Sequence, residues 1–260
     1  MKVFILTDLE GVCGVFRWGQ TGLEDDPAAY AEARRLLMGE VNAAVEGAFE
    51  GGAARVVVDD GHNAAKSFIP EELDERAEMV MGISSPDDLV VKQGFDCAIL
   101  LGYHCMSHTP HGVLCHTQSS KTWDNYWING RLAGEIAQMA IRLGGYDIPV
   151  TMVTGDEAAC AEARDWLGDD VVTVPVKRGL ARQGALMLAP KRARNLIREG
   201  AKEAVGKAPS LKPYKPRFPL TVRWQFKDSE IVDLYRGPGK KIDATTIERE
   251  VFEAKDVVRP

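Results

Sequence analysis

The sequence lacks the cysteine patterns that mark disulfide frameworks and zinc knuckles. Its 260 residues include only five cysteines, an odd number, and no two of them are spaced as Cys-x-x-Cys. The five are Cys13, Cys97, Cys105, Cys115 and Cys160. We therefore expect buried free thiols.

Long apolar runs and an excess of basic residues are also missing. No stretch approaches the ~18 apolar residues of a membrane span, and residues 3–6 are too few for the core of a signal peptide. The formal net charge is −6, whereas a nucleic-acid surface needs a basic stripe. No Gly-x-x-x-x-Gly-Lys-Ser/Thr loop occurs, which argues against nucleotide binding but not against simple phosphatases. The sequence favours a cytoplasmic protein that binds neither nucleic acid nor a membrane.

Strand-like and helix-like segments alternate through the first two thirds of the chain. Apolar and β-branched runs predict strands, and apolar positions at helical spacing predict helices that glycines close. The predicted strands are 3–6, 55–58, 97–101, 150–154 and 171–176, and the predicted helices are 27–50, 134–143 and 157–167. Such alternation is typical of parallel βαβ units. We predict an α/β fold with a largely parallel sheet flanked by helices.

The last third of the chain departs from this alternation. Pro190 begins a predicted helix, a proline-rich loop follows, and residues 220–226 alternate as in a half-buried strand. The apolar stripe of the helix consists of Ala193, Leu196, Ile197, Gly200 and Ala204. Asp243 is placed to cap a last helix. The apolar positions of that last helix are Ile247, Val251 and Phe252. We predict a metal-binding α/β catalytic domain over residues 1–177 and a smaller α+β domain over residues 178–260.

Carboxylates and histidines follow three of the predicted strands. Asp8 and Glu10 come directly after the first strand, His62 follows the second, and His104 follows the third. Because the carboxyl ends of parallel strands open on one edge of a sheet, these side chains should meet there. Glu135 starts a helix on the same stripe as its apolar residues, and a buried carboxylate needs a partner. The pattern predicts a cluster of five potential metal ligands.

This donor set fits a pair of metal ions. Mixed nitrogen and oxygen ligands suit zinc, and also manganese or iron. Five protein ligands exceed the three of a single catalytic zinc, and two cations sharing a bridging carboxylate would activate a bridging water and polarise a carbonyl. The same residues also have structural interpretations: Asp8 and Glu10 as turn formers, His62 as a loop partner, and Glu135 as a helix cap. Composition and spacing leave both interpretations open.

Six motifs in a fixed order carry a family resemblance. In chain order they are Thr7-Asp8-Leu9-Glu10-Gly11, Val58-Asp59-Asp60-Gly61-His62, Leu101-Gly102-Tyr103-His104, Gly112-Val113-Leu114-Cys115-His116, Tyr126-Trp127-Ile128-Asn129 followed by Gly134-Glu135, and Thr154-Gly155-Asp156. This order resembles that of the zinc D-aminopeptidases of the dipeptide-permease operon type. The resemblance covers residues 1 to about 177 and weakens afterwards. One departure is Thr7 where the family usually has Ser, and both residues offer a hydroxyl.

The resemblance implies a site, a reaction and an assembly. It implies that Asp8, Glu10, His62, His104 and Glu135 hold two zinc ions per subunit, with Asp8 as the bridge. His116 matches the family's nucleophile; a role as general acid or base stays open. The implied substrate is a short peptide with a D-residue such as D-Ala at its amino end. The implied assembly is a homo-oligomer, a ring-stacked decamer.

Two other classes of function stay open. A similar metal pair could serve a phosphoesterase or a non-peptide amidase, and a non-catalytic metal-binding assembly protein could share the fold. Asn129 is either a hydrogen-bond donor to an oxyanion or a turn former before Gly130. His108 and His111 are not part of the family pattern and are expected at the surface.

Overall fold

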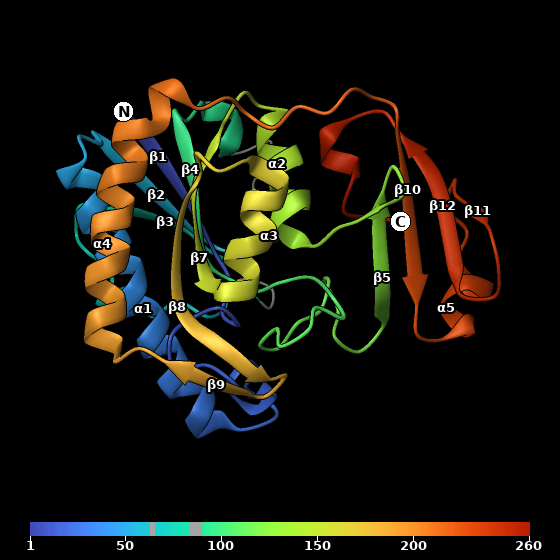
Figure 1. Cartoon of the computed structure of the whole chain (residues 1–260), viewed down its shortest axis with the longest axis horizontal. Helices are drawn as coiled ribbons and strands as arrows, with labels where there is room; N and C mark the ends of the chain where they lie inside the picture. The colour runs from blue at the N-terminus through green and yellow to red at the C-terminus, as the bar shows by residue number, and fades with distance from the viewer. Residues whose placement is uncertain (63–65, 84–89) are drawn as a thin grey trace.

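The computed structural model of the chain describes residues 1–62, 66–83 and 90–260. Its elements form four layers in the order helices, sheet, helices, sheet (Figure 1). The larger sheet has the strand order β3-β2-β1-β4-β7-β8-β9. Its strands are β1 (Lys2–Thr7), β2 (Arg55–Asp60), β3 (Glu78–Val80), β4 (Cys97–Tyr103), β7 (Val150–Asp156), β8 (Val172–Ala181) and β9 (Gly184–Met187). All neighbouring strands pair in parallel except β8 and β9, so the sheet is largely parallel as predicted.

Alternating side chains of the central strands build two cores. In β1, Val3 and Ile5 belong to the core on one face, whereas Phe4 belongs to the core on the other. Both faces are therefore buried, which explains why residues 3–6 of β1 and most of β4 are apolar rather than alternating with polar residues.

Helices cover both faces of the larger sheet. They are α1 (Pro27–Glu50), α2 (Glu135–Gly144), α3 (Glu157–Leu167) and α4 (Pro190–Lys207). The short helix α5 (Ser229–Leu234) instead packs on β10 (Leu220–Phe226) of a second sheet. Single-turn 3-10 helices lie at Trp18–Gln20, Pro70–Glu72, Val91–Gln93, Ala208–Ser210 and Ala254–Asp256. Helices α1 and α4 pack side by side on one face, and α2 and α3 lie on the other (Figure 1). The predicted α/β fold with flanking helices is confirmed.

A second, antiparallel sheet packs against the outer side of α2 and α3. Its order is β11-β12-β10-β5-β6. The strands are β5 (Trp123–Ile128), β6 (Arg131–Leu132), β10 (Leu220–Phe226), β11 (Lys240–Lys241) and β12 (Thr246–Val251). Helix α2 serves both sheets, because Ile136 and Ala140 face the larger sheet while Ala137 and Ile141 face the smaller one. This shared helix ties the two sheets together next to Glu135.

The boundary between the sheets does not coincide with residue 177. Strands β5 and β6 precede that residue and belong to the smaller sheet, whereas β9 and α4 follow it and pack on the larger one. The division into domains 1–177 and 178–260 stays a proposal about folding units.

The prediction of a helix after Asp243 is wrong. Residues 246–251 form strand β12, whose Ile247 pairs with Trp224 of β10. The Asp243 carboxylate instead accepts a hydrogen bond from the backbone N–H of Thr245, which closes a turn. Pairing on both sides, with β10 and β11, decides the conformation of this segment.

The exposure of individual side chains tests several smaller predictions. The stripe of α4 is buried at Ala193, Ile197, Gly200 and Ala204, but Leu196 is 42% exposed and was assigned to that stripe incorrectly. All five cysteines are free and buried, as expected. Among the described residues, no helix is both long and apolar enough to cross a membrane.

Candidate metal centre

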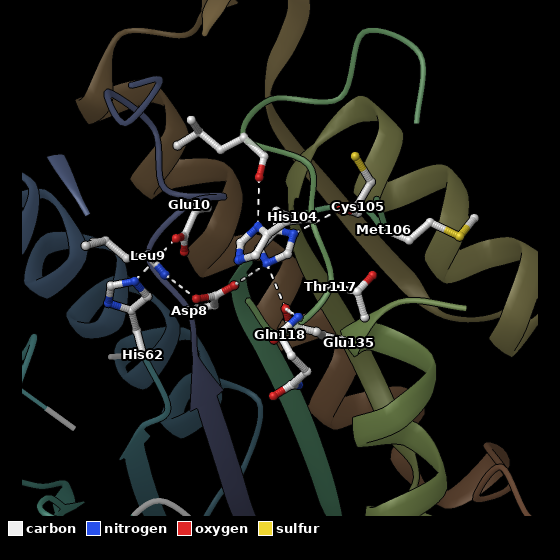
Figure 2. Close-up of polar contacts among 12 residues, drawn as sticks. Asp8, Leu9, Glu10, His62, His104, Cys105, Met106, Thr117, Gln118 and Glu135 are labelled. Carbon is white, nitrogen blue, oxygen red and sulfur yellow. Dashed lines mark hydrogen bonds and ion pairs between the residues drawn. The ribbon is translucent and has the colours of Figure 1, made fainter. Parts of the chain in front are cut away.

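The site lies at the carboxyl edge of the larger sheet, where three neighbouring strands end. Asp8 and Glu10 follow β1, His62 follows β2, and His104 follows β4. Glu135 is the first residue of α2 and points at the same place (Figure 2). The parallel order β2-β1-β4 therefore brings together side chains that are up to 127 positions apart in the sequence.

Close backbone packing fixes the segment after β1. The N–H of Gly11 donates to the carbonyl of Gly102 at 2.7 Å. A Cβ on Gly11 would lie 2.1 Å from the carbonyl oxygen of Tyr103, so only glycine fits there. The hydroxyl of Thr7, which replaces the family's serine, donates to the carbonyl of Asp59 at 2.9 Å.

His62 is held between a hydroxyl and a carboxylate. Its Nδ1 lies 3.0 Å from Oγ of Ser67, and its Nε2 lies 3.3 Å from Oε1 of Glu10. Burial by itself would lower the pKa of His62, but the negative charge of Glu10 outweighs burial and raises it to about 9. His62 is thus paired electrostatically with the segment after β1.

His104 is the centre of the cluster. Its Nδ1 donates to the carbonyl of Cys105 at 2.9 Å, so the other ring nitrogen is left for the site. That Nε2 lies 3.3 Å from Oδ2 of Asp8 and 3.2 Å from Oε1 of Glu135. Burial opposes a charge on the ring, yet the two carboxylates raise the pKa of His104 well above its usual value.

His116 stacks on His104. The ring centroids are 4.0 Å apart and the rings are inclined by 13°. Nδ1 of His116 donates to the carbonyl of Leu114 at 2.8 Å, which directs Nε2 away from that contact. Leu114 is buried with φ at 52°, a left-handed conformation that is unfavourable for leucine. Burial lowers the pKa of His116, and the neighbouring His104 lowers it further.

The electrostatic environment of the carboxylates fits a cation site. Oδ2 of Asp8 and Oε2 of Glu10 are buried and accept no hydrogen bond from the described residues. Burial raises the pKa of Asp8 well above its usual value, and the charge of Glu10 adds to this effect. In Glu10 and Glu135 burial also acts to raise the pKa, but His62 and His104, respectively, outweigh it and leave each pKa lowered. Buried anions with open lone pairs are expected where a cation binds.

Two overlapping groups of ligand atoms surround this position. Asp8, Glu10 and His104 form one group, and His104, His116 and Glu135 form the other; within each, the ligand atoms lie within 4.8 Å of one another. Carboxylate oxygens together with imidazole Nε2 atoms are a donor set that zinc accepts. The residues present therefore fit a zinc centre.

Sequence reasoning brought the ligand candidates together but missed their supports. The backbone N–H of Gln118 donates to Oε1 of Glu135 at 2.7 Å, and the side chain of Gln118 donates to Gln138 of α2. Asp60 accepts hydrogen bonds from the backbone of residues 67 and 68, which holds Ser67 against His62. Each of the two stands two residues from a candidate histidine, and Asp60 also belongs to the motif that ends at His62, but neither signal indicated a supporting role.

Three further polar residues lie outside the cluster. His108 and His111 are exposed, as expected, and His108 pairs with Asp124 at 2.7 Å. Asn129 sits in the turn between β5 and β6 with φ at 50°, and its side-chain oxygen accepts from the N–H of Thr221. This geometry favours the turn-forming interpretation of Asn129.

A comparison of the whole chain with known families decides its relationship. A model of the D-aminopeptidase family matches residues 1–259. The chain belongs to this family. The predicted resemblance to D-aminopeptidases, and with it the prediction of a peptidase, is confirmed.

Two similar proteins support membership of the D-aminopeptidase family. The D-aminopeptidase of Bacillus subtilis (strain 168) is 30% identical over 263 residues, which cover 99% of this chain and 93% of the relative. A solved structure described as the Zn-dependent D-aminopeptidase DppA from Bacillus subtilis, a self-compartmentalizing protease, superposes with a TM-score of 0.90. It is 27% identical, and the match covers 99% of this chain and 94% of the other. The similarity therefore includes the last third of the chain, where the motifs were weak.

Proposed function

We propose that this chain is a zinc-dependent aminopeptidase that removes the N-terminal residue, preferentially a D-residue such as D-Ala, from short peptides. The observation that carries the proposal is the convergence of Asp8, Glu10, His62, His104 and Glu135, with two buried carboxylate oxygens left open. Five such ligands suit two zinc ions, with Asp8 between them. Membership of the D-aminopeptidase family supports the reaction class.

Zinc, when bound, would supply Lewis-acid activation of water and of the scissile carbonyl. The remaining chemistry belongs to the chain. His116 is the proposed catalytic residue because its lowered pKa keeps the ring neutral near pH 7. Its Nδ1 proton is held by Leu114, so Nε2 is free to attack a carbonyl or to exchange a proton.

A cavity of about 430 Å³ borders the cluster at Glu135. Its apolar lining from the larger sheet and α2 includes Phe4, Leu6 and Met139, and Trp123 also lines it. Gln118, whose N–H donates to Glu135, is a further lining residue. The volume is that of a small-molecule site. We propose that the cavity takes part of a short peptide and is too small for a folded protein segment.

We further propose that the chain acts as a homo-oligomer, with a decamer as the expected form. The support is its similarity to a protein described as self-compartmentalizing. We also propose a cytoplasmic location, consistent with the absence of a membrane-crossing helix among the described residues.

The decisive experiment measures hydrolysis of D-Ala-D-Ala and L-Ala-L-Ala by the purified full chain, with metal content determined on the same sample. Two zinc equivalents and release of D-Ala, lost with a chelator and restored by zinc, are the expected result. Bound metal without cleavage of either dipeptide would sink the substrate assignment, and p-nitrophenyl phosphate then tests the phosphoesterase alternative. A chain that binds no zinc at all would sink the metal centre itself.

A further inference from the structure

A buried lysine contacts the segment that follows β1. Lys177 of β8 is only 3% exposed, yet its ammonium donates to three backbone carbonyls. The acceptors are the carbonyls of Glu10 at 2.5 Å, Val12 at 2.9 Å and Val15 at 2.6 Å. An ammonium has three N–H donors, so this arrangement uses all of them.

The three carbonyls belong to one turn of chain that follows Asp8. Residues 10–15 form no strand or helix. The turn is also held by Glu40, which accepts from the N–H of Cys13 at 2.9 Å, and by Gln20, which donates to the carbonyl of Gly14 at 2.8 Å. Lys177 is thus the single side chain among the described residues that bonds to three carbonyls of this turn.

The charge of Lys177 faces carboxylates that are engaged elsewhere. Burial lowers the pKa of Lys177 to about 8, and the acidic neighbours Asp156 and Glu40, with a smaller contribution from Glu10, act in the opposite direction. Both carboxylates have backbone partners of their own: Asp156 accepts from Val113, and Glu40 accepts from Cys13. The ammonium is therefore directed at the carbonyls rather than consumed in a simple ion pair.

We propose that Lys177 is a positioning residue for the zinc ligands Asp8 and Glu10. The bond to the carbonyl of Glu10 fixes the backbone from which that side chain reaches His62. The bonds to the carbonyls of residues 12 and 15 hold the turn closed and so restrict movement of the backbone at residue 10. This proposal rests on the proposed zinc centre, because it assigns to Lys177 the preorganisation of that centre.

Removing the ammonium should disturb the positions of the zinc ligands more than it destabilises the sheet. Lys177→Met keeps the length and apolar stem of the side chain but leaves three buried carbonyls without their donor. Replacing a residue that orients a metal ligand through hydrogen bonds typically changes metal affinity 10–100-fold. We expect a loss of zinc affinity in that range and a fall in kcat with little change in KM.

The test is competition for zinc between a chromophoric chelator and the metal-free full-length protein, well below the melting temperature of every variant. The control is Val174→Ala on the same strand β8, where Val174 is buried in the apolar core next to Gly200 of α4. We expect Lys177→Met to bind zinc at least tenfold more weakly than the wild type. Val174→Ala should lower the melting temperature and leave zinc affinity within twofold.

Three further outcomes keep the test decisive. If Lys177→Met retains wild-type zinc affinity and loses only stability, the residue is structural and the proposal is overturned. If that variant does not fold, Lys177→Gln replaces it. The shorter glutamine has two N–H donors for three carbonyls, so at least one carbonyl loses its donor, and unchanged zinc affinity in this variant would also overturn the proposal. A wild-type protein that binds no zinc would instead count against the proposed function, so the two failures are distinguishable.

Discussion

The imidazole rings of His104 and His116 are stacked nearly parallel, with their centroids 4.0 Å apart. Each ring donates a hydrogen bond from Nδ1 to a backbone carbonyl. The acceptor is Cys105 for His104 and Leu114 for His116. The two Nε2 atoms therefore remain for ligand or substrate. Two charged rings at this separation would repel each other, so the carboxylates around His104 decide which ring takes a proton.

The stacked pair predicts different results for two similar substitutions. His104→Gln should abolish zinc binding, because its Nε2 lies between Asp8 and Glu135. His116→Gln should retain zinc and lose about 10²–10⁴-fold in kcat. Zinc content and steady-state kinetics on the same samples measure both effects. The exposed His108→Gln is the matched control and should behave as the wild type. Loss of zinc from His116→Gln would make His116 a ligand instead.

Metal removal should destabilise the protein. Oδ2 of Asp8 and Oε2 of Glu10 are buried and accept no hydrogen bond from the described residues. A ligand at ~1,000 times its Kd stabilises the folded state by about 4 kcal/mol, which corresponds to roughly 10 °C in melting temperature for a domain near this size. We expect chelation to lower the melting temperature by that order and added zinc to restore it. No response to zinc in a scanning calorimeter would contradict a bound metal.

The turn at Asn129 predicts a structural rather than a catalytic effect. Asn129 and Gly130 both have positive φ, and they connect the paired residues Ile128 and Arg131. Asn129→Ala should cost about 1–2 kcal/mol of stability, since alanine resists that conformation. Asn129→Gly should fold well and keep kcat/KM within twofold. A large loss of activity in a stable Asn129→Gly protein would instead support an oxyanion role.

Glu40 predicts a dependence of stability on pH that lies outside the ligand set. Burial raises its pKa to about 7, although the N–H of Cys13 and the charge of Lys177 act in the opposite direction. An acid whose pKa is raised on folding stabilises the protein fully below its unfolded pKa of about 4.5, and that stability is lost as pH rises through 7. The glutamine of Glu40→Gln stays neutral at every pH. The free energy of unfolding of this variant, relative to that of the wild type, should therefore grow by about 2–3 kcal/mol between pH 5 and pH 8.

Denaturant unfolding of the Glu40→Gln variant at the two pH values measures this difference. Glu32→Gln, at an exposed position of the same helix α1, is the control and should show no such growth. An equal effect of Glu40→Gln at both pH values would mean that the carboxyl keeps an ordinary pKa in the folded protein.

The sequence alone determined the layered α/β fold and the meeting of the five candidate ligands. Residues 3–6 of β1, residues 56–58 of β2 and most of β4 form continuous apolar runs because both faces of the sheet are covered there, and such runs are visible locally. The candidate ligands follow strand ends, and parallel strands end on one edge whatever lies between them. Neither inference required knowledge of long-range contacts.

Tertiary structure decided what local spacing leaves ambiguous. Ile247 and Val251 are four residues apart, a spacing that lies on one face of a helix and equally on one face of a strand. Pairing of Ile247 with Trp224 selected the strand, and this contact spans 23 positions. The same holds at the site: Lys177 reaches the carbonyl of Glu10 across 167 positions. No local propensity encodes such a bond, because it exists only once β8 has joined the sheet beside the turn.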